Sequence, residues 1–123
     1  MKTVMIIDDD KRIRDFVRLF LEREGYTVLE ASDGKEGMSL FSRQQPDLVI
    51  LDIFMPEQDG LETIGEIRDR YGNCKIIAIS GGGSISGMDI LKYSKAFGAE
   101  AVLEKPFDEK ELLDLVKRLA PDS

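Results

Sequence analysis

Short apolar runs alternate along the chain with segments in which apolar residues recur at helical spacing. The runs are unbroken stretches of Val, Ile and Leu, as at residues 48–51, which is typical of strands buried on both faces. From Ile13 to Leu21 apolar residues return three and four positions apart, which predicts one face of a helix. The same alternation predicts strands at 5–7, 26–30, 48–51, 75–79 and 101–104, and helices at 13–21, 34–44, 61–72, 86–97 and 109–119.

Capping residues mark where these helices begin and end. Asp10 and Asp108 precede the first and last helices, where a carboxylate can accept from free backbone N–H groups, and Asp9 is a second candidate for the first cap. Gly25 follows the first helix in the usual C-terminal position. Because strand and helix alternate throughout, we expect a doubly wound α/β fold with helices on both faces of a parallel sheet.

Composition narrows the possible functions. The 123 residues suit one domain, spanning residues 1–123, and an apolar share of 42% can fill a core. A net charge of −7 argues against binding nucleic acid. The absence of histidine excludes a Ser-His-Asp triad, a histidine metal ligand and a phosphohistidine made on this chain. The single cysteine, Cys74, excludes an internal disulfide and a cysteine zinc site.

Nothing in the sequence indicates a membrane segment. The apolar runs are far shorter than the roughly 20 residues that a spanning helix needs. The first run meets three aspartates, which is unlike the apolar part of a secretion signal. With one cysteine and no sign of export, we expect a soluble cytoplasmic protein.

The predicted strands bring reactive side chains to one edge of the sheet. Asp8 and Asp9 follow the first strand, and Asp52 follows the third. Ser80 follows the fourth strand, and Lys105 follows the fifth. The carboxyl ends of parallel strands meet at one edge, where such sheets bind ligands, so these residues should lie together. Each alone could be a helix cap, a turn hydroxyl or an exposed lysine, but their coincidence at four strand ends favours a functional site.

Three carboxylates at one edge repel one another unless a cation lies between them. Mg²⁺ prefers oxygen ligands and typically accepts one or two carboxylates together with waters and a phosphate oxygen. A carboxylate can also attack phosphorus and form an acyl phosphate. Mg²⁺, the Lys105 ammonium and the Ser80 hydroxyl could then each bind one of the negatively charged oxygens of the transferring phosphoryl group. The pattern predicts a magnesium site that handles a phosphoryl group.

The motifs resemble those of receiver domains of bacterial two-component response regulators. The matching stretches are residues 6–10, 48–56 with 59–60, 79–80, 98–99 and 105–107, in the family's order and over essentially the whole chain. The resemblance implies a flavodoxin-like (βα)5 fold with a five-stranded parallel sheet in the order 2-1-3-4-5. Only residues 120–123 follow the last predicted helix, so we expect a stand-alone response regulator of the chemotaxis type, with no output domain. Such a protein is not an enzyme beyond catalysing its own phosphorylation and dephosphorylation.

The resemblance assigns the metal and phosphoryl roles. Asp52 is implied as the phosphoacceptor and as a metal ligand. Asp9 would bind Mg²⁺ directly and Asp8 largely through water. The backbone carbonyl of Phe54 would complete the site, which Mn²⁺ could also fill.

The resemblance also implies a switch and partners. Ser80 would be the switch hydroxyl and Lys105 would contact the phosphoryl group, with the Lys105–Pro106 peptide bond in cis. The donor would be a phosphohistidine on a sensor histidine kinase or a histidine phosphotransfer protein. The output would be phosphorelay or a phosphorylation-dependent contact with an unknown downstream protein, and neither nucleic acid nor a membrane would be a partner.

The sequence departs from the family pattern in three places. Val102 stands where the family has a switch aromatic three residues before the lysine. Residues 81–83 are all glycine, which makes the loop after Ser80 unusual. Phe54 is apolar where it could exclude hydrolytic water. The basic residues of the first helix are interpreted as a solvated face: Lys11, Arg12, Arg14 and Arg18.

Three alternatives stay open. Val102 and the glycine loop would also suit a pseudo-receiver that binds partners without phosphate. Asp8 and Asp10 resemble the nucleophile motif of aspartyl-phosphate phosphatases, although Arg12 replaces the usual Thr or Val. A flavodoxin-like FMN carrier has the same fold, but its first loop would need hydroxyls and glycine in place of three carboxylates.

Overall fold

The computed structural model describes residues 2–53, 60–80 and 98–121. Its strands are β1 (Thr3–Ile7), β2 (Thr27–Ala31), β3 (Leu48–Asp52), β4 (Lys75–Ser80) and β5 (Ala101–Glu104). The helices in these ranges are α1 (Lys11–Arg23), α2 (Gly34–Arg43), α3 (Gly60–Arg70) and α5 (Glu109–Leu119). The helix predicted at 86–97 lies outside the described residues.

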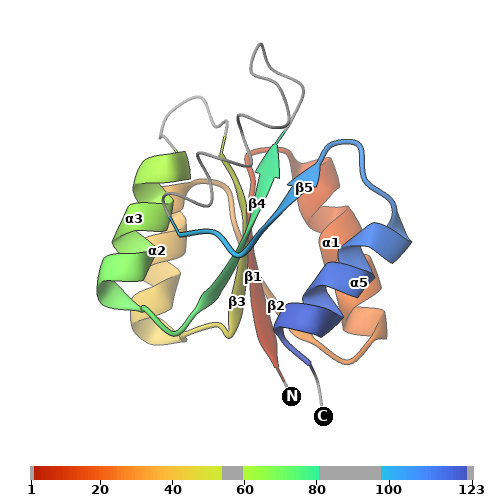
Figure 1. Cartoon of the computed structure of the whole chain (residues 1–123), viewed down its shortest axis with the longest axis horizontal. Helices are drawn as coiled ribbons and strands as arrows, with labels where there is room; N and C mark the ends of the chain where they lie inside the picture. The colour runs from red at the N-terminus through yellow and green to blue at the C-terminus, as the bar shows by residue number, and fades with distance from the viewer. Residues whose placement is uncertain (1, 54–59, 81–97, 122–123) are drawn as a thin grey trace.

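All five strands pair in parallel in the order β2-β1-β3-β4-β5. Helices α1 and α5 cover one face of the sheet, and α2 and α3 cover the other (Figure 1). The predicted doubly wound, flavodoxin-like α/β fold is confirmed. In the part of the chain that the structure describes, no helix has both the length and the apolar character to span a membrane.

The two-sided burial of the sheet explains the unbroken apolar runs. Val4 and Ile6 pack into the core under α1 and α5, whereas Met5 and Ile7 pack into the core under α2 and α3. All four side chains are completely buried. Burying one such side chain stabilises the fold by about 1.5–3 kcal/mol, so the sheet is a rigid platform for the residues at its edge.

The predicted caps are present. The Asp10 side chain accepts from the backbone N–H of Arg12 at 2.9 Å, and Asp108 forms a capping box with Glu111 at the start of α5. Gly25 has a φ of 92°, the left-handed conformation that favours glycine after a helix.

Strand β2 begins one residue later than predicted. Tyr26 is buried at 3% exposure, and its hydroxyl donates to the Ala120 carbonyl at 2.8 Å. The strand ladder starts at Thr27, opposite Thr3. In the sequence, a buried aromatic residue that bonds to the end of α5 therefore cannot be told apart from the first residue of the strand.

Gly60 is required where α3 passes close to the end of β3. A Cβ at this position would lie 2.3 Å from Ile53 Cα and 2.7 Å from the Asp52 carbonyl oxygen. Backbone atoms cannot move aside easily, so we expect Gly60→Ala to lower the free energy of unfolding by at least about 2 kcal/mol in urea denaturation. Gly65 is the matched control, because a Cβ there meets no atom of the described residues within 4 Å.

The control substitution should act in the opposite direction. Gly65→Ala adds a good helix former in open space within α3, which should raise the free energy of unfolding by about 0.5–1 kcal/mol. Equal effects of the two substitutions would contradict the close approach of α3 to β3.

Candidate functional site

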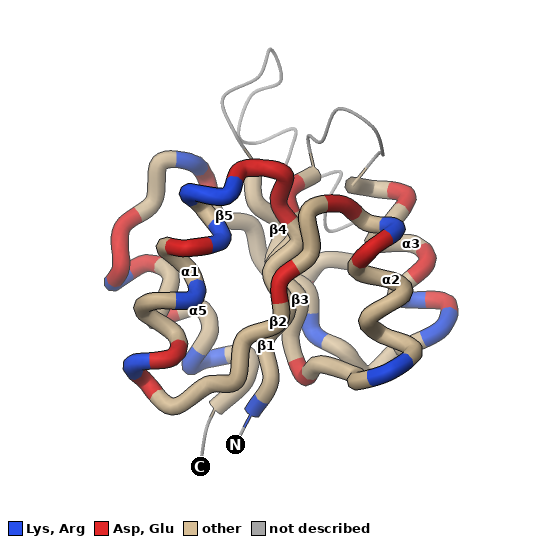
Figure 2. The backbone as a smooth tube through the Cα atoms, turned by 180° about the vertical axis from the view of Figure 1, so that it is seen from behind, with Lys and Arg blue, Asp and Glu red and all other residues tan. Residues whose placement is uncertain are grey.

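Four strands deliver the predicted side chains to one edge of the sheet. Asp8 follows β1, Asp52 ends β3, Ser80 ends β4 and Lys105 follows β5. The register places Asp52 beside Ile79 of β4, one residue before Ser80. Figure 2 shows a run of acidic residues at this edge, which leads directly into the basic first turn of α1.

Lys105 lies between two buried carboxylates. Its ammonium Nζ is 3.0 Å from Asp8 Oδ2 and 3.1 Å from Asp52 Oδ2. Asp8 is fully buried and Asp52 is 3% exposed, so neither charge is well solvated. Burial by itself would lower the pKa of Lys105, but the contacts with Asp8 and Asp52 outweigh it and raise the pKa. Lys105 is therefore a stable cation at the centre of the site.

Asp8 shares the single positive charge of Lys105 with Asp52. Its Oδ1 accepts from the backbone N–H of Asp10 at 2.8 Å. Its buried Oδ2 lies 3.0 Å from the Lys105 ammonium as an ion pair, with no further hydrogen-bond partner among the described residues. Burial raises the pKa of Asp8 above its usual value, and the charge of Asp52 adds to this effect. An incompletely compensated buried carboxylate of this kind fits a bound cation.

Asp9 completes an acidic cluster that could hold a metal ion. One carboxylate oxygen from each of Asp8, Asp9 and Asp52 lies within 4.8 Å of the other two. Asp9 is exposed, whereas the other two are buried, so a cation could enter from the Asp9 side. An all-oxygen donor set with one open side fits Mg²⁺ or Mn²⁺. The predicted fourth ligand, the carbonyl of Phe54, lies outside the described residues.

The ends of β4 and β5 are joined beside this cluster. The Lys105 backbone N–H donates to the Ser80 carbonyl at 2.8 Å, and Ser80 is 3% exposed. The Lys105–Pro106 peptide bond is cis. Val102 lies in β5 and packs partly buried against the core under α2 and α3. The glycines at 81–83 lie outside the described residues.

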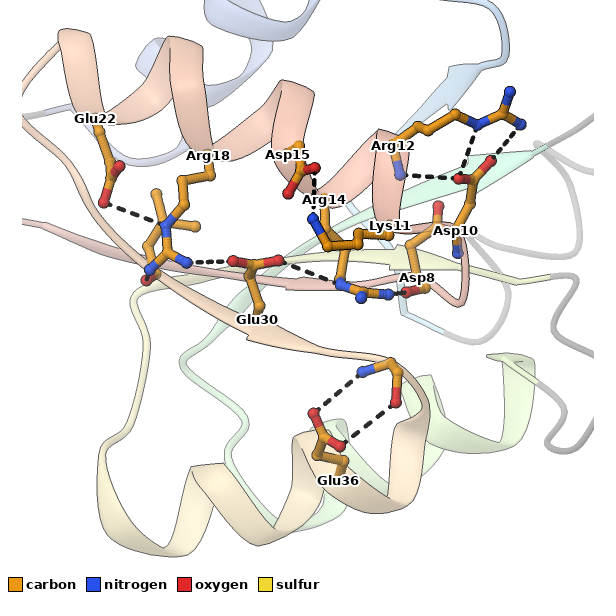
Figure 3. A network of polar contacts seen from close by, with 12 residues as sticks. Asp8, Asp10, Lys11, Arg12, Arg14, Asp15, Arg18, Glu22, Glu30 and Glu36 are labelled. Atoms are coloured by element: carbon orange, nitrogen blue, oxygen red, sulfur yellow. Dashed lines mark hydrogen bonds and ion pairs between the residues drawn. The ribbon is translucent and has the colours of Figure 1, made fainter.

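The prediction of a solvated basic face on α1 is wrong for Arg14. The Lys11 and Arg12 side chains are 76% and 91% exposed, but that of Arg14 is 16% exposed. Arg14 reaches across to Glu30 of β2 and to the backbone of Asp8, as Figure 3 shows. The sequence contains a sign of this burial. Arg14 precedes the buried residues Val17 and Leu21 by three and seven positions, which places it on the buried side of the helix.

Cys74 is the one thiol of the chain, and it lies away from this edge, just before β4. It is 6% exposed, and burial raises the pKa of its thiol to about 12. Because the thiolate is the reactive form, and each pKa unit reduces its population tenfold, alkylation at pH 8 should be at least about 100-fold slower than in the urea-unfolded chain. Mass spectrometry after iodoacetamide treatment measures both rates, and equal rates would contradict the burial of this thiol.

The chain is similar in sequence to known response regulators. The sequence profile described as response regulator receiver domain matches residues 4–117. The chain is 35% identical to the response regulator MprA of Mycolicibacterium vanbaalenii, over 97% of this chain and 52% of that protein. It is 31% identical to sporulation initiation phosphotransferase F of Bacillus subtilis, over 96% of this chain and 93% of that protein.

Solved structures give the same result. The chemotaxis protein CheY4 of Vibrio cholerae superimposes with a TM-score of 0.86 at 30% identity, over 97% of this chain and 98% of that one. The relatives differ in length, since the chain spans about half of MprA but nearly all of phosphotransferase F. The similarity therefore covers a whole receiver domain, which occurs in these relatives with and without further sequence.

Proposed function

The chain belongs to the response regulator receiver domain family, and on this premise we propose that it accepts a phosphoryl group on Asp52, with Mg²⁺ bound beside it. The main observation in support is that the Lys105 ammonium contacts the two buried carboxylates Asp8 and Asp52. Asp9 adds a third carboxylate on the open side. A nucleophile, a cation for the phosphoryl group and a group of carboxylates that could hold a metal ion thus lie close to one another.

In the proposed reaction a carboxylate oxygen of Asp52 attacks the phosphorus of a phosphohistidine on a sensor kinase or a phosphotransfer protein. The new P–O bond forms as the P–N bond breaks, and the departing imidazole keeps the electron pair and takes up a proton. Asp9, Asp52 and the Phe54 carbonyl would hold Mg²⁺ directly, and Asp8 would hold it through water. The bound ion would neutralise the charge of one phosphoryl oxygen. The donor must be another protein, because this chain has no histidine.

Lys105 and Ser80 are proposed to contact the phosphoryl group once it is on Asp52. Lys105 can exchange a contact with Asp8 or Asp52 for a phosphoryl oxygen, because its ammonium already lies 3.1 Å from the Asp52 carboxylate that would carry the group. The backbone hydrogen bond from Lys105 to Ser80 links the ends of β4 and β5, so both strands respond together. The phosphoryl group then biases a two-state equilibrium through its different contacts in the two states.

The proposed output is a contact with a downstream protein or onward transfer in a phosphorelay. The name of the Bacillus subtilis relative describes phosphotransfer, which supports the second possibility. Val102 has no aromatic ring, so a ring rotation at this position is not part of the proposed output.

The test is the intact mass of the protein after incubation with acetyl phosphate, with Mg²⁺ or with a chelator. We expect a gain of one phosphoryl group with Mg²⁺ and none with the chelator. No gain under either condition, including with a cognate kinase, would contradict the proposal and favour a pseudo-receiver that binds partners without phosphate. Turnover of many small phosphoesters per protein molecule would favour the phosphatase.

A further inference from the structure

Arg14 makes contacts that an exposed helix residue does not make. Its guanidinium donates to the backbone carbonyl of Asp8 at 2.7 Å. A second donor of the same group, Nε, lies 3.2 Å from Glu30 Oε1. Glu30 also pairs with Arg18, so its carboxylate is held from both sides (Figure 3). Arg14 is thus fixed in one orientation, directed at the end of β1.

The carbonyl that Arg14 contacts belongs to the peptide that joins Asp8 to Asp9. The other side of Asp8 is also fixed, because its backbone N–H donates to the Ala31 carbonyl at 3.1 Å. Glu30 and Ala31 are neighbours at the end of β2. Strand β2 therefore holds Asp8 directly through Ala31 and indirectly through Glu30 and Arg14.

We propose that Arg14 is a positioning residue for the metal ligands. By fixing the Asp8–Asp9 peptide it sets the direction in which both carboxylates leave the backbone, and so raises the affinity of the site for a divalent cation. This inference rests on the proposed function, since it concerns the same cation site. Glu30 contributes by orienting Arg14 and does not contact the cluster itself.

Simple electrostatics predicts the opposite effect, which makes the proposal testable. Arg14 is a positive charge close to a site for a cation, so its charge alone disfavours binding. Removing it should strengthen Mg²⁺ binding if charge is all that matters. Removing it should weaken Mg²⁺ binding if Arg14 positions the ligands.

Arg18 is a matched control on the same helix. It also pairs with Glu30, and its other described contacts are with Glu22 and the Val28 carbonyl. Substituting either arginine removes one positive charge and one partner of Glu30. The two substitutions differ in the contact with the Asp8 carbonyl, which Arg14 makes.

The experiment is isothermal titration with Mg²⁺ alone, without phosphodonor, on the wild type, Arg14→Ala and Arg18→Ala. We expect the Kd of Arg14→Ala to rise about tenfold, the lower end for a group that orients a metal ligand. The Kd of Arg18→Ala should stay at the wild-type value or fall. At saturating Mg²⁺ the phosphorylation rate of Arg14→Ala should return to nearly the wild-type rate, since Asp52 and Lys105 are intact.

A second pair of variants keeps the test valid if Arg14→Ala does not fold. Arg14→Lys and Arg18→Lys retain the charge, but the flexible point charge of lysine does not reproduce the fixed planar geometry with which the guanidinium holds its acceptors. We expect Arg14→Lys to bind Mg²⁺ more weakly than Arg18→Lys. If the Arg14 and Arg18 variants of a folded pair bind Mg²⁺ with equal affinity, Arg14 does not position the metal ligands. Absence of Mg²⁺ binding by the wild type would instead overturn the proposed function.

Discussion

Asp52→Asn is expected to abolish phosphoryl uptake from acetyl phosphate. The amide has nearly the same shape as the carboxylate but lacks the nucleophilic oxygen anion, so the acyl phosphate cannot form. The substitution should leave the fold intact, because it removes one of two buried carboxylates that share the Lys105 ammonium. Intact mass after incubation with Mg²⁺ and acetyl phosphate measures uptake, and thermal unfolding without Mg²⁺ should show a midpoint at or above that of the wild type.

Asp114→Asn is a suitable control for the same chemical change. Its side chain is 64% exposed on α5, where it pairs with Lys110. This variant should take up phosphate as the wild type does. If Asp52→Asn were phosphorylated at the wild-type rate, the nucleophile would have to be another residue.

Lys105→Met is expected to have two large effects. It removes the ammonium that we propose contacts a phosphoryl oxygen. This should slow phosphoryl uptake about 100-fold, as the loss of one positioned hydrogen-bond donor does in other active sites. It also leaves Asp8 and Asp52 buried without their common partner. Removing one partner of a buried ion pair is costly, so the free energy of unfolding should fall by about 3 kcal/mol in urea with a chelator present.

Lys110→Met separates these effects from the general loss of a lysine. Lys110 is 83% exposed and pairs with Asp114 at the surface, where an ion pair contributes little to stability. Added Mg²⁺ should restore part of the lost stability of Lys105→Met and none of that of Lys110→Met. Equal losses in the two variants would contradict the central position of Lys105.

The fold could be predicted from sequence because the pattern is local and repeated. A strand buried on both faces needs unbroken apolar runs, and residues 48–51 show this plainly. Capping is equally local, so Asp10 and Asp108 were identifiable as caps from their positions before helices. The meeting of Asp8, Asp52 and Lys105 followed from topology alone, since parallel strands share one carboxyl edge.

The contacts between elements could not be predicted in the same way. Helical spacing places Arg14 on the buried side of α1, but it does not show that Glu30 and the Asp8 carbonyl lie within its reach. The predicted start of β2 is one residue too early, because Tyr26 is buried to pack in the core and not as a strand residue. Its hydroxyl donates to the Ala120 carbonyl. Each of these depends on distances across the fold, which hydrophobic periodicity does not contain.

The most direct test of the central claim is to locate the phosphoryl group itself. After incubation with Mg²⁺ and acetyl phosphate, borohydride reduces an acyl phosphate to an alcohol, which converts the modified aspartate to homoserine. Peptide mapping by mass spectrometry should find homoserine at position 52, in the protein treated with the phosphodonor and not in the untreated sample. Homoserine at position 8 or 9, or at none of the three aspartates, would contradict the assignment of Asp52 as the phosphoacceptor.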